Sequence, residues 1–338
     1  MHEITIRGTY SEMGAELGKL MKQHKYEPPP ISEDRFELAR GCEHALEEHA
    51  PSLLEELSAI EEAGGYEDTH LKVFEMTLNP FPQFGCSILA ISREHTLTGK
   101  VIFGRSMDWE TRFHDYFTLF RTYPKGALAS LSCTDVAVGR YGGINEAGLA
   151  IGMTAITGTR HDVPGIMFHL ATRWVLDNCR TVKDAVNFLQ RIPHVRPNHY
   201  LVADLQGDMA YIQASPEKVE VVGPVEGLVV VTNHFQTSDM QPSDKLSSED
   251  ERYLTESSIP RLEVLKNWFK NRTGKIDSVQ VQSVSSGMID EGAGVCQDLL
   301  IQGTQFSTIW ARTFEAGGRI IQIADGSPRE VDFKEYTF

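Results

Sequence analysis

A change in hydrophobic pattern near residue 84 constrains the fold of this chain more than any other feature. Before it, residues 10–25 and 32–63 place apolar side chains three and four positions apart among Glu and Lys, as amphipathic helices do. After it, short β-type runs are separated by glycine-containing turns, namely CSILAIS, KVIFGRSM, YFTLFRTY, LASLSC and LAIGMTAI. The pattern predicts a mostly helical start over roughly the first 80 residues, followed by β-sheets.

The later elements also come in blocks of one kind. Helices are predicted over 166–179 and 183–192, strands over 199–215 and 218–235, a polar loop over 236–258, a helix over 260–271 and a hairpin over 305–328. Thr181 is placed to cap the second helix, Pro260 begins the third, and Gly207 and Gly317–Gly318 mark turns. Because strands are grouped with strands, we expect an α+β fold of four layers (αββα), with two antiparallel sheets between helical layers, rather than a βαβ alternation.

Composition excludes several classes of partner. The chain has 338 residues, of which 41% are apolar and 23% charged, so it is long enough for a sizeable core. Its formal charge of −15 is spread along the chain, whereas nucleic acids and anionic membranes select for clustered Lys and Arg. Neither is therefore expected as a partner, and a small molecule fits better.

Cysteine usage and the N-terminus favour a cytoplasmic protein. Five scattered cysteines, without a CxxC pair, are typical of reduced thiols rather than of a disulfide scaffold or a structural zinc site. The first residues lack the pattern of a signal peptide, and no apolar run approaches the roughly 20 residues of a membrane span. The HExxH, GxSxG, P-loop and GxGxxG motifs are also absent from the sequence, so neither a metal nor another cofactor is expected.

One cysteine, in PQFGCSILAIS, lies at the upstream edge of a predicted buried strand. If residues 86–92 and 100–106 form a hairpin, Cys86 falls opposite Ser106, with Arg105 and Asp108 close to the sulfur. A guanidinium near a thiol favours the thiolate, which is the nucleophilic form. From the residues alone an alternative stays open, in which the cysteine is a small buried hydrophobe and the two charges form a surface ion pair.

At FGCSILAIS and FGRSMDWE the chain resembles the N-terminal-nucleophile (Ntn) cysteine hydrolases. The likeness is closest to the acyl-CoA:6-aminopenicillanic acid (isopenicillin N) acyltransferase-like and choloylglycine hydrolase group. It extends in the same order to GTYSEMGAELGKLM, GGINEAGLAIGMT, NHYLVADLQGDMAYIQASP and VVTNHF. It implies the four-layer Ntn fold, no cofactor, and an enzyme that hydrolyses a linear amide or transfers its acyl group.

The resemblance also implies a precursor that cleaves itself. In such proteins the thiol attacks the carbonyl before it, here that of Gly85, and water then releases Cys86 as a new N-terminus. One residue then supplies both nucleophile and base, because a free α-amine has a pKa near that of a thiol. Residues 1–85 would be a helical propeptide or small chain, and residues 86–338 the catalytic core, within one structural domain overall.

Further roles are implied position by position. Arg105 and Asp108 match the arginine and aspartate that steady the cysteine and its amine. Asn233, in VVTNHF, matches the asparagine whose NH₂ group donates to the oxyanion, and Thr154 stands where bile-salt-type members have a second asparagine. Taken alone, Asn233 also fits an ordinary strand-end residue that caps a turn.

The chain departs from the family pattern at one position. Acyltransferase-like members have an arginine in a segment resembling GVCQDLL, where this chain has Gln297. Either the alignment slips there, Arg312 substitutes for the missing charge, or the site lacks it. Trp109, Phe113 and Tyr116 follow Asp108 and are candidates for an acyl pocket, although ordinary packing explains them equally well.

We therefore expect an autoprocessing Ntn cysteine amidohydrolase or acyltransferase that acts on an N-acyl small molecule, or uses an acyl donor, through a Cys86 thioester. The alternative is an unprocessed or catalytically silent member that binds an acylated small molecule. Two assembly states are open: a heterodimer of the two cleavage products, and a homo-oligomer.

Overall fold

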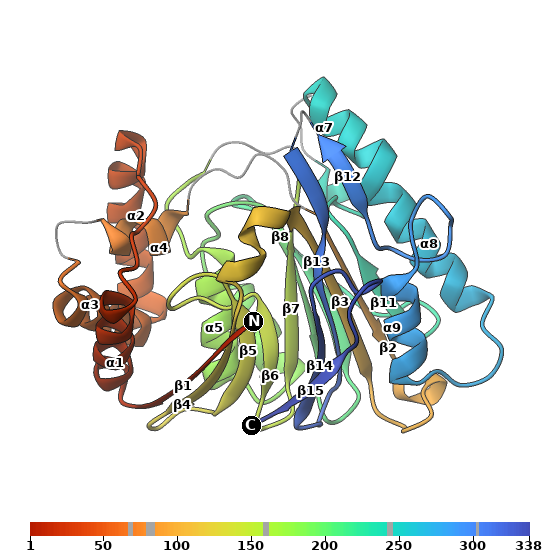
Figure 1. The fold of residues 1–338 in the computed structure, drawn as a ribbon, viewed down its shortest axis with the longest axis horizontal. Coiled ribbons are helices and arrows are strands. Elements are labelled where there is room, and N and C mark those ends of the chain that lie inside the picture. The colour runs from red at the N-terminus through yellow and green to blue at the C-terminus, as the bar shows by residue number, and fades with distance from the viewer. Residues whose placement is uncertain (67–69, 79–84, 158–161, 242–245, 302–303) are drawn as a thin grey trace.

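The computed structural model describes residues 1–66, 70–78, 85–157, 162–241, 246–301 and 304–338. Two β-sheets pack face to face, and helices cover the outer face of each (Figure 1). The predicted four-layer α+β architecture is confirmed.

The first sheet has eight strands in the described residues, and it carries the N-terminal strand at its edge. Its order is β1 (His2–Gly8), β4 (Thr118–Pro124), β5 (Ser130–Thr134), β6 (Gly142–Asn145), β7 (Ala150–Ala155), β8 (Asn198–Ala203), β9 (Met209–Ala214) and β10 (Val219–Val222). All of these pairs are antiparallel except β1–β4, which is parallel. The expectation of purely antiparallel sheets is therefore wrong at this edge, whereas the mostly helical start is confirmed, with β1 as a short strand ahead of the first helix.

The second sheet has seven strands in the described residues and carries the candidate site. Its order is β11 (Leu228–Val231), β2 (Gly85–Ile91), β3 (Ile102–Glu110), β13 (Thr304–Glu315), β14 (Ile320–Asp325) and β15 (Lys334–Thr337), with β12 (Asp298–Ile301) paired to β13. The predicted hairpin turn at Gly317–Gly318 joins β13 to β14, and Gly207 joins β8 to β9 with a positive φ of 92°.

In the described part of the chain, six helices lie on the side of the first sheet: α1 (Tyr10–Gln23), α2 (Glu33–His49), α3 (Pro51–Gly64), α4 (Leu71–Thr77), α5 (Phe168–Asn178) and α6 (Val182–Leu189). The single helix expected over 32–63 is two helices, because Ala50 leaves helical geometry and Pro51 starts a new first turn. Thr181 caps α6 as predicted, in a capping box with Asp184.

On the side of the second sheet lie α7 (Ser248–Tyr253), a π-helical turn (Leu254–Ser258), α8 (Ile259–Lys270) and α9 (Ser278–Ser286). The polar loop expected over 236–258 is therefore wrong for its second half. The Ser247 side chain caps α7 by accepting the Asp250 N–H, and acidic side chains fill the first turn. Short 3₁₀ turns are found at Arg93–His95, Thr111–Tyr116 and Ser238–Met240.

Alternate residues of β2 enter two different apolar cores. Ile88 and Ala90 face the space between the sheets, where Phe103 packs, whereas Leu89 and Ile91 pack with side chains of α8 such as Leu265. The strand is buried along its whole length, so it holds its first residues rigidly. Within the described residues, each helix is too short or too polar to cross a bilayer.

Candidate active site

Cys86 is the second residue of β2, and it lies opposite Met107 of β3 rather than opposite Ser106. The expected register is wrong by one residue, and such a shift moves a side chain to the other face of a sheet. In the observed register Cys86 and Arg105 share the face that looks toward the first sheet. Arg105 Nη2 donates to Cys86 Sγ at 3.5 Å, and its Nη1 donates to the Tyr141 carbonyl at 2.6 Å.

The thiol of Cys86 is fully buried. Burial raises its pKa, against the opposing effect of the neighbouring Arg105 guanidinium. The guanidinium alone therefore does not produce the thiolate that the sequence suggested, and the thiol needs a base to take its proton.

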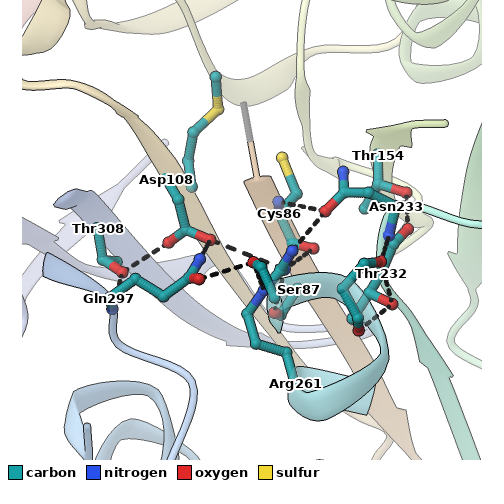
Figure 2. Close-up of polar contacts among 12 residues, drawn as sticks. Cys86, Ser87, Asp108, Thr154, Thr232, Asn233, Arg261, Gln297 and Thr308 are labelled. Carbon is teal, nitrogen blue, oxygen red and sulfur yellow. Dashed lines mark hydrogen bonds and ion pairs between the residues drawn. The ribbon is translucent and has the colours of Figure 1, made fainter. Parts of the chain in front are cut away.

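Asn233 follows β11 by two residues and, by continuation of the β11–β2 register, lies opposite Cys86. Its Oδ1 accepts the Cys86 backbone N–H at 3.0 Å, Arg261 Nη2 at 2.8 Å and the Tyr253 hydroxyl at 3.0 Å. Its Nδ2 donates to the Ala155 carbonyl at 2.9 Å. Because the backbone N–H and the guanidinium can only donate, these contacts fix which way the carboxamide points (Figure 2).

Asp108 lies opposite Gly85, on the face of β3 that looks toward α8. Its Oδ1 accepts the Thr308 hydroxyl at 2.6 Å, and its Oδ2 accepts Gln297 Nε2 at 2.6 Å. Arg261 Nη1 lies 3.7 Å from the same Oδ2. The carboxylate is thus held beside the Gly85–Cys86 peptide by two neutral donors and one cation (Figure 2).

Arg261 is a member of the site that the sequence interpretation missed. It comes from the first turn of α8 and is fully buried. Its Nη1 donates to the Cys86 carbonyl at 2.5 Å and to Ser87 Oγ at 2.9 Å, and its Nη2 to Asn233 and to Tyr253. No local sequence motif points to it, because its partners Cys86 and Asn233 lie far from it in the sequence.

Gln297 and Arg312, the two candidates for the missing family charge, are both buried but lie in different places. Gln297 contacts Asp108 directly. Arg312 pairs with Arg105 across β13 and β3, and donates to the carbonyls of Gly142 at 2.9 Å and of Tyr141 at 3.1 Å. The buried cation that contacts Cys86, Asn233 and Asp108 from the helical layer is Arg261.

Thr154 is also buried, in β7, and its hydroxyl donates to the Thr232 carbonyl at 2.7 Å. The side chain is therefore occupied by a contact with the residue before Asn233. The aromatic candidates form a separate group. The rings of Trp109 and Phe113 pack edge to face with their centroids 5.6 Å apart, and the ring centroids of Phe113 and Tyr116 are 6.2 Å apart. Tyr116 is 58% exposed, so this group leads from a buried residue to the surface.

The four-layer αββα arrangement is the fold expected of the Ntn hydrolases. The family model described as acyl-coenzyme A:6-aminopenicillanic acid acyl-transferase matches residues 96–330. The chain therefore belongs to this family, and it is an amide hydrolase or amide acyltransferase, which confirms the resemblance. The match begins after Cys86, so the case for that residue rests on the geometry above.

Three solved structures illustrate the similarity. A mutant conjugated bile acid hydrolase from Clostridium perfringens is 15% identical, over 75% of this chain and 97% of that one, with a TM-score of 0.45. Penicillin V acylase from Agrobacterium tumefaciens is 18% identical, over 71% and 82%, with a TM-score of 0.48. An N-acylethanolamine-hydrolyzing acid amidase ortholog from Caenorhabditis elegans is 14% identical, over 75% and 99%, with a TM-score of 0.46. A search of curated proteins found no match.

Proposed function

We propose that this chain cleaves itself between Gly85 and Cys86 and then hydrolyses, or transfers the acyl group of, a linear non-peptide amide through a thioester on Cys86. The observation that carries the proposal is that both reactive atoms of Cys86 are held separately. Its backbone N–H donates a hydrogen bond to Asn233 Oδ1, and its sulfur accepts one from Arg105 Nη2.

In the cleavage step Cys86 Sγ attacks the Gly85 carbonyl carbon. The C–N bond to Cys86 breaks, the thiol proton goes to the released amine, and the acyl group resides on sulfur. Water then hydrolyses this thioester and leaves a carboxylate on Gly85. The lack of space for a side chain explains why residue 85 is glycine, because a Cβ there would lie 2.6 Å from Asp108 Oδ2.

In turnover the new α-amine serves as the base. A free α-amine has a pKa of about 7.7 to 8, so it can take the proton of a thiol that burial holds in its neutral form. The sulfur then attacks the substrate carbonyl, the proton passes to the departing amine, and water or an acceptor amine releases the acyl group from sulfur. Asn233 Oδ1 and Asp108 would hold the amine in place.

The developing oxyanion is assigned to the Nδ2 group of Asn233, whose orientation the contacts on Oδ1 fix. Such a donor typically contributes 10²–10³ in rate. Because the Thr154 hydroxyl is directed to the Thr232 carbonyl, only the Thr154 backbone N–H is proposed as a second donor. Trp109 and Phe113 are proposed to line part of the acyl site.

After cleavage, residues 1–85 would remain bound to residues 86–338 as the small chain of a heterodimer. Strand β1 supports this because it pairs with β4 over seven residues. The fully buried ion pair between Glu56 and Arg173, with a separation of 3.1 Å, supports it as well.

Intact-mass measurement of freshly purified protein tests the cleavage. Wild type is expected to show a species that begins at Cys86, and Cys86→Ala only the full-length chain. A panel of penicillin V, conjugated bile salts, N-acyl-homoserine lactones and N-acyl amino acids then tests turnover by the processed protein. The proposal is lost if the Cys86→Ala variant is cleaved or keeps activity.

A second function is an unprocessed protein that binds an acylated small molecule. The complete burial of the Cys86 thiol favours it. In that case wild type stays full length in the mass measurement, and members of the same panel bind without being consumed.

A further inference from the structure

Gln297 has a buried polar side chain next to the site, and the proposed mechanism gives this side chain no role. We propose that Gln297 is a positioning residue that holds Asp108 against the Gly85–Cys86 peptide and connects it to Arg261. The inference rests on the proposed function, since it concerns the same site.

The first support is a chain of hydrogen bonds that runs in one direction. Arg261 Nε donates to Ser257 Oγ at 3.2 Å, Ser257 Oγ donates to Gln297 Oε1 at 2.7 Å, and Gln297 Nε2 donates to Asp108 Oδ2 at 2.6 Å. All four residues are buried, with 4% exposure or less. A chain that begins at a cation and ends at an anion is polarised along its length, which strengthens each bond in a buried setting.

The second support is that the backbone of Gln297 is itself fixed. Its N–H donates to Thr308 Oγ1 at 2.9 Å, and its carbonyl accepts the Thr308 N–H at 2.9 Å. The β13–β3 register shifts between Thr308 and Trp310, next to the site. Such irregularities often re-aim a side chain, and here the hydroxyl of Thr308 contacts the other oxygen of Asp108.

A neutral amide suits this position better than a charged group. A second cation would compete with Arg261 for Asp108 and would repel any ammonium formed on Cys86. A carboxylate would repel Asp108 once both were ionised. The amide orients Asp108 and leaves its charge available to the nitrogen of Cys86.

The decisive variant is Gln297→Glu, because a protonated glutamate can still donate to Asp108 whereas an ionised one cannot. Among the residues that the structure describes, the charged or titratable groups that face Asp108 are Arg261 of α8, Tyr253 of α7, Cys86 of β2 and Cys296 before β12. Two carboxyls at this distance share one proton, and the second ionisation moves to higher pH.

We expect the kcat/KM of Gln297→Glu, relative to wild type, to fall at least about tenfold between pH 5 and pH 8, as the shared proton is lost. The rate of self-cleavage of Gln297→Glu, relative to wild type, is expected to fall over the same pH range. Intact-mass measurement follows this rate. Gln305→Glu is the matched control, because Gln305 is exposed in β13 and its amide donates to Asp298, whose side chain is also exposed. Its ratio to wild type should stay near one at every pH.

A pH-independent ratio for Gln297→Glu would overturn the inference. If that variant unfolds at pH 8, Gln297→Met tests the inference instead. The inference then requires that the kcat of Gln297→Met be at least about tenfold lower than that of wild type, with KM within twofold. A wild-type kcat in Gln297→Met overturns it. Failure of wild type itself to cleave or turn over would instead overturn the proposed function, so the two failures are distinguishable.

Discussion

At the residue scale, Gly85 leaves room for the carboxylate of Asp108. A Cβ at this position would lie 2.6 Å from Asp108 Oδ2 and 3.1 Å from the Tyr253 hydroxyl. We expect Gly85→Ala to displace both groups and to slow cleavage at least about tenfold, as misplaced catalytic groups do. The measurement is the fraction of full-length chain over time by intact mass.

The control for this substitution is Gly223→Ala, because a Cβ at Gly223 would meet open space and the φ there is not positive. Gly223→Ala should be processed as wild type is. A Gly85→Ala chain that is cleaved at the wild-type rate would contradict the steric argument.

The sequence located part of the site, but not all of it. Cys86, Arg105 and Asp108 are close in sequence on one hairpin, so local motifs could bring them together. Arg261 could not be found in this way, because its contacts exist only once α8 packs across the end of β2. The same packing explains why Gln297 looked like a missing charge and proves to be a hydrogen-bond donor.

At the element scale, the π-helical turn Leu254–Ser258 brings three donors together. Pro260 follows it, and proline both lacks an N–H and clashes with the carbonyl four residues earlier in a regular α-helix. Arg261, beyond the π-helical turn, contacts Tyr253 before it and Ser257 within it. Such turns are frequent at functional sites.

We predict that Pro260→Ala restores a regular helix and shifts Tyr253 relative to Arg261. The free energy of unfolding should change by no more than about 1 kcal/mol, because the helix loses strain but the unfolded chain gains freedom. The kcat should fall severalfold. Urea unfolding and steady-state kinetics measure the two quantities. Pro51→Ala, in the first turn of α3, is the control, and an unchanged kcat in Pro260→Ala would contradict the prediction.

The elements themselves were predictable where the hydrophobic period was clear. Helix α8 and the β13–β14 hairpin were expected at nearly their observed positions. The β2–β3 register was not, because turn composition fixes pairing only to within a residue and the choice depends on which face is buried. Strand β1 was missed for a similar reason, since its partner β4 lies more than a hundred residues away.

At the scale of the whole molecule, the described residues that precede Cys86 contribute many side chains to the core. Glu75 of α4 is fully buried, and its carboxylate accepts the backbone N–H groups of Ala137 at 2.7 Å and Val138 at 3.1 Å. Burial raises the pKa of Glu75 to about 7, from an ordinary value of 4.5.

The raised pKa predicts a pH dependence of stability. Between about pH 4.5 and 7, Glu75 holds a proton in the folded protein but not in the unfolded protein. The contribution of Glu75 to the free energy of unfolding therefore falls as the pH rises through that range. Relative to Glu75→Gln, wild type should lose stability between pH 5 and pH 8, by on the order of 1–3 kcal/mol. Urea unfolding at the two pH values measures the difference.

Glu37→Gln serves as the control, because Glu37 is exposed on α2, and its stability difference from wild type should not change with pH. A Glu75→Gln difference that is constant, or that grows in favour of wild type as pH rises, would refute the assignment.

The parallel pairing of β1 with β4 has a practical consequence for producing residues 86–338, the larger product of the proposed cleavage. Residues 86–338 expressed alone would present an open sheet edge and lose Glu56, one of the two buried carboxylates that pair with Arg173, so this piece is expected to aggregate. The two pieces should be produced together, and an affinity tag on the first piece should carry the second through a purification column.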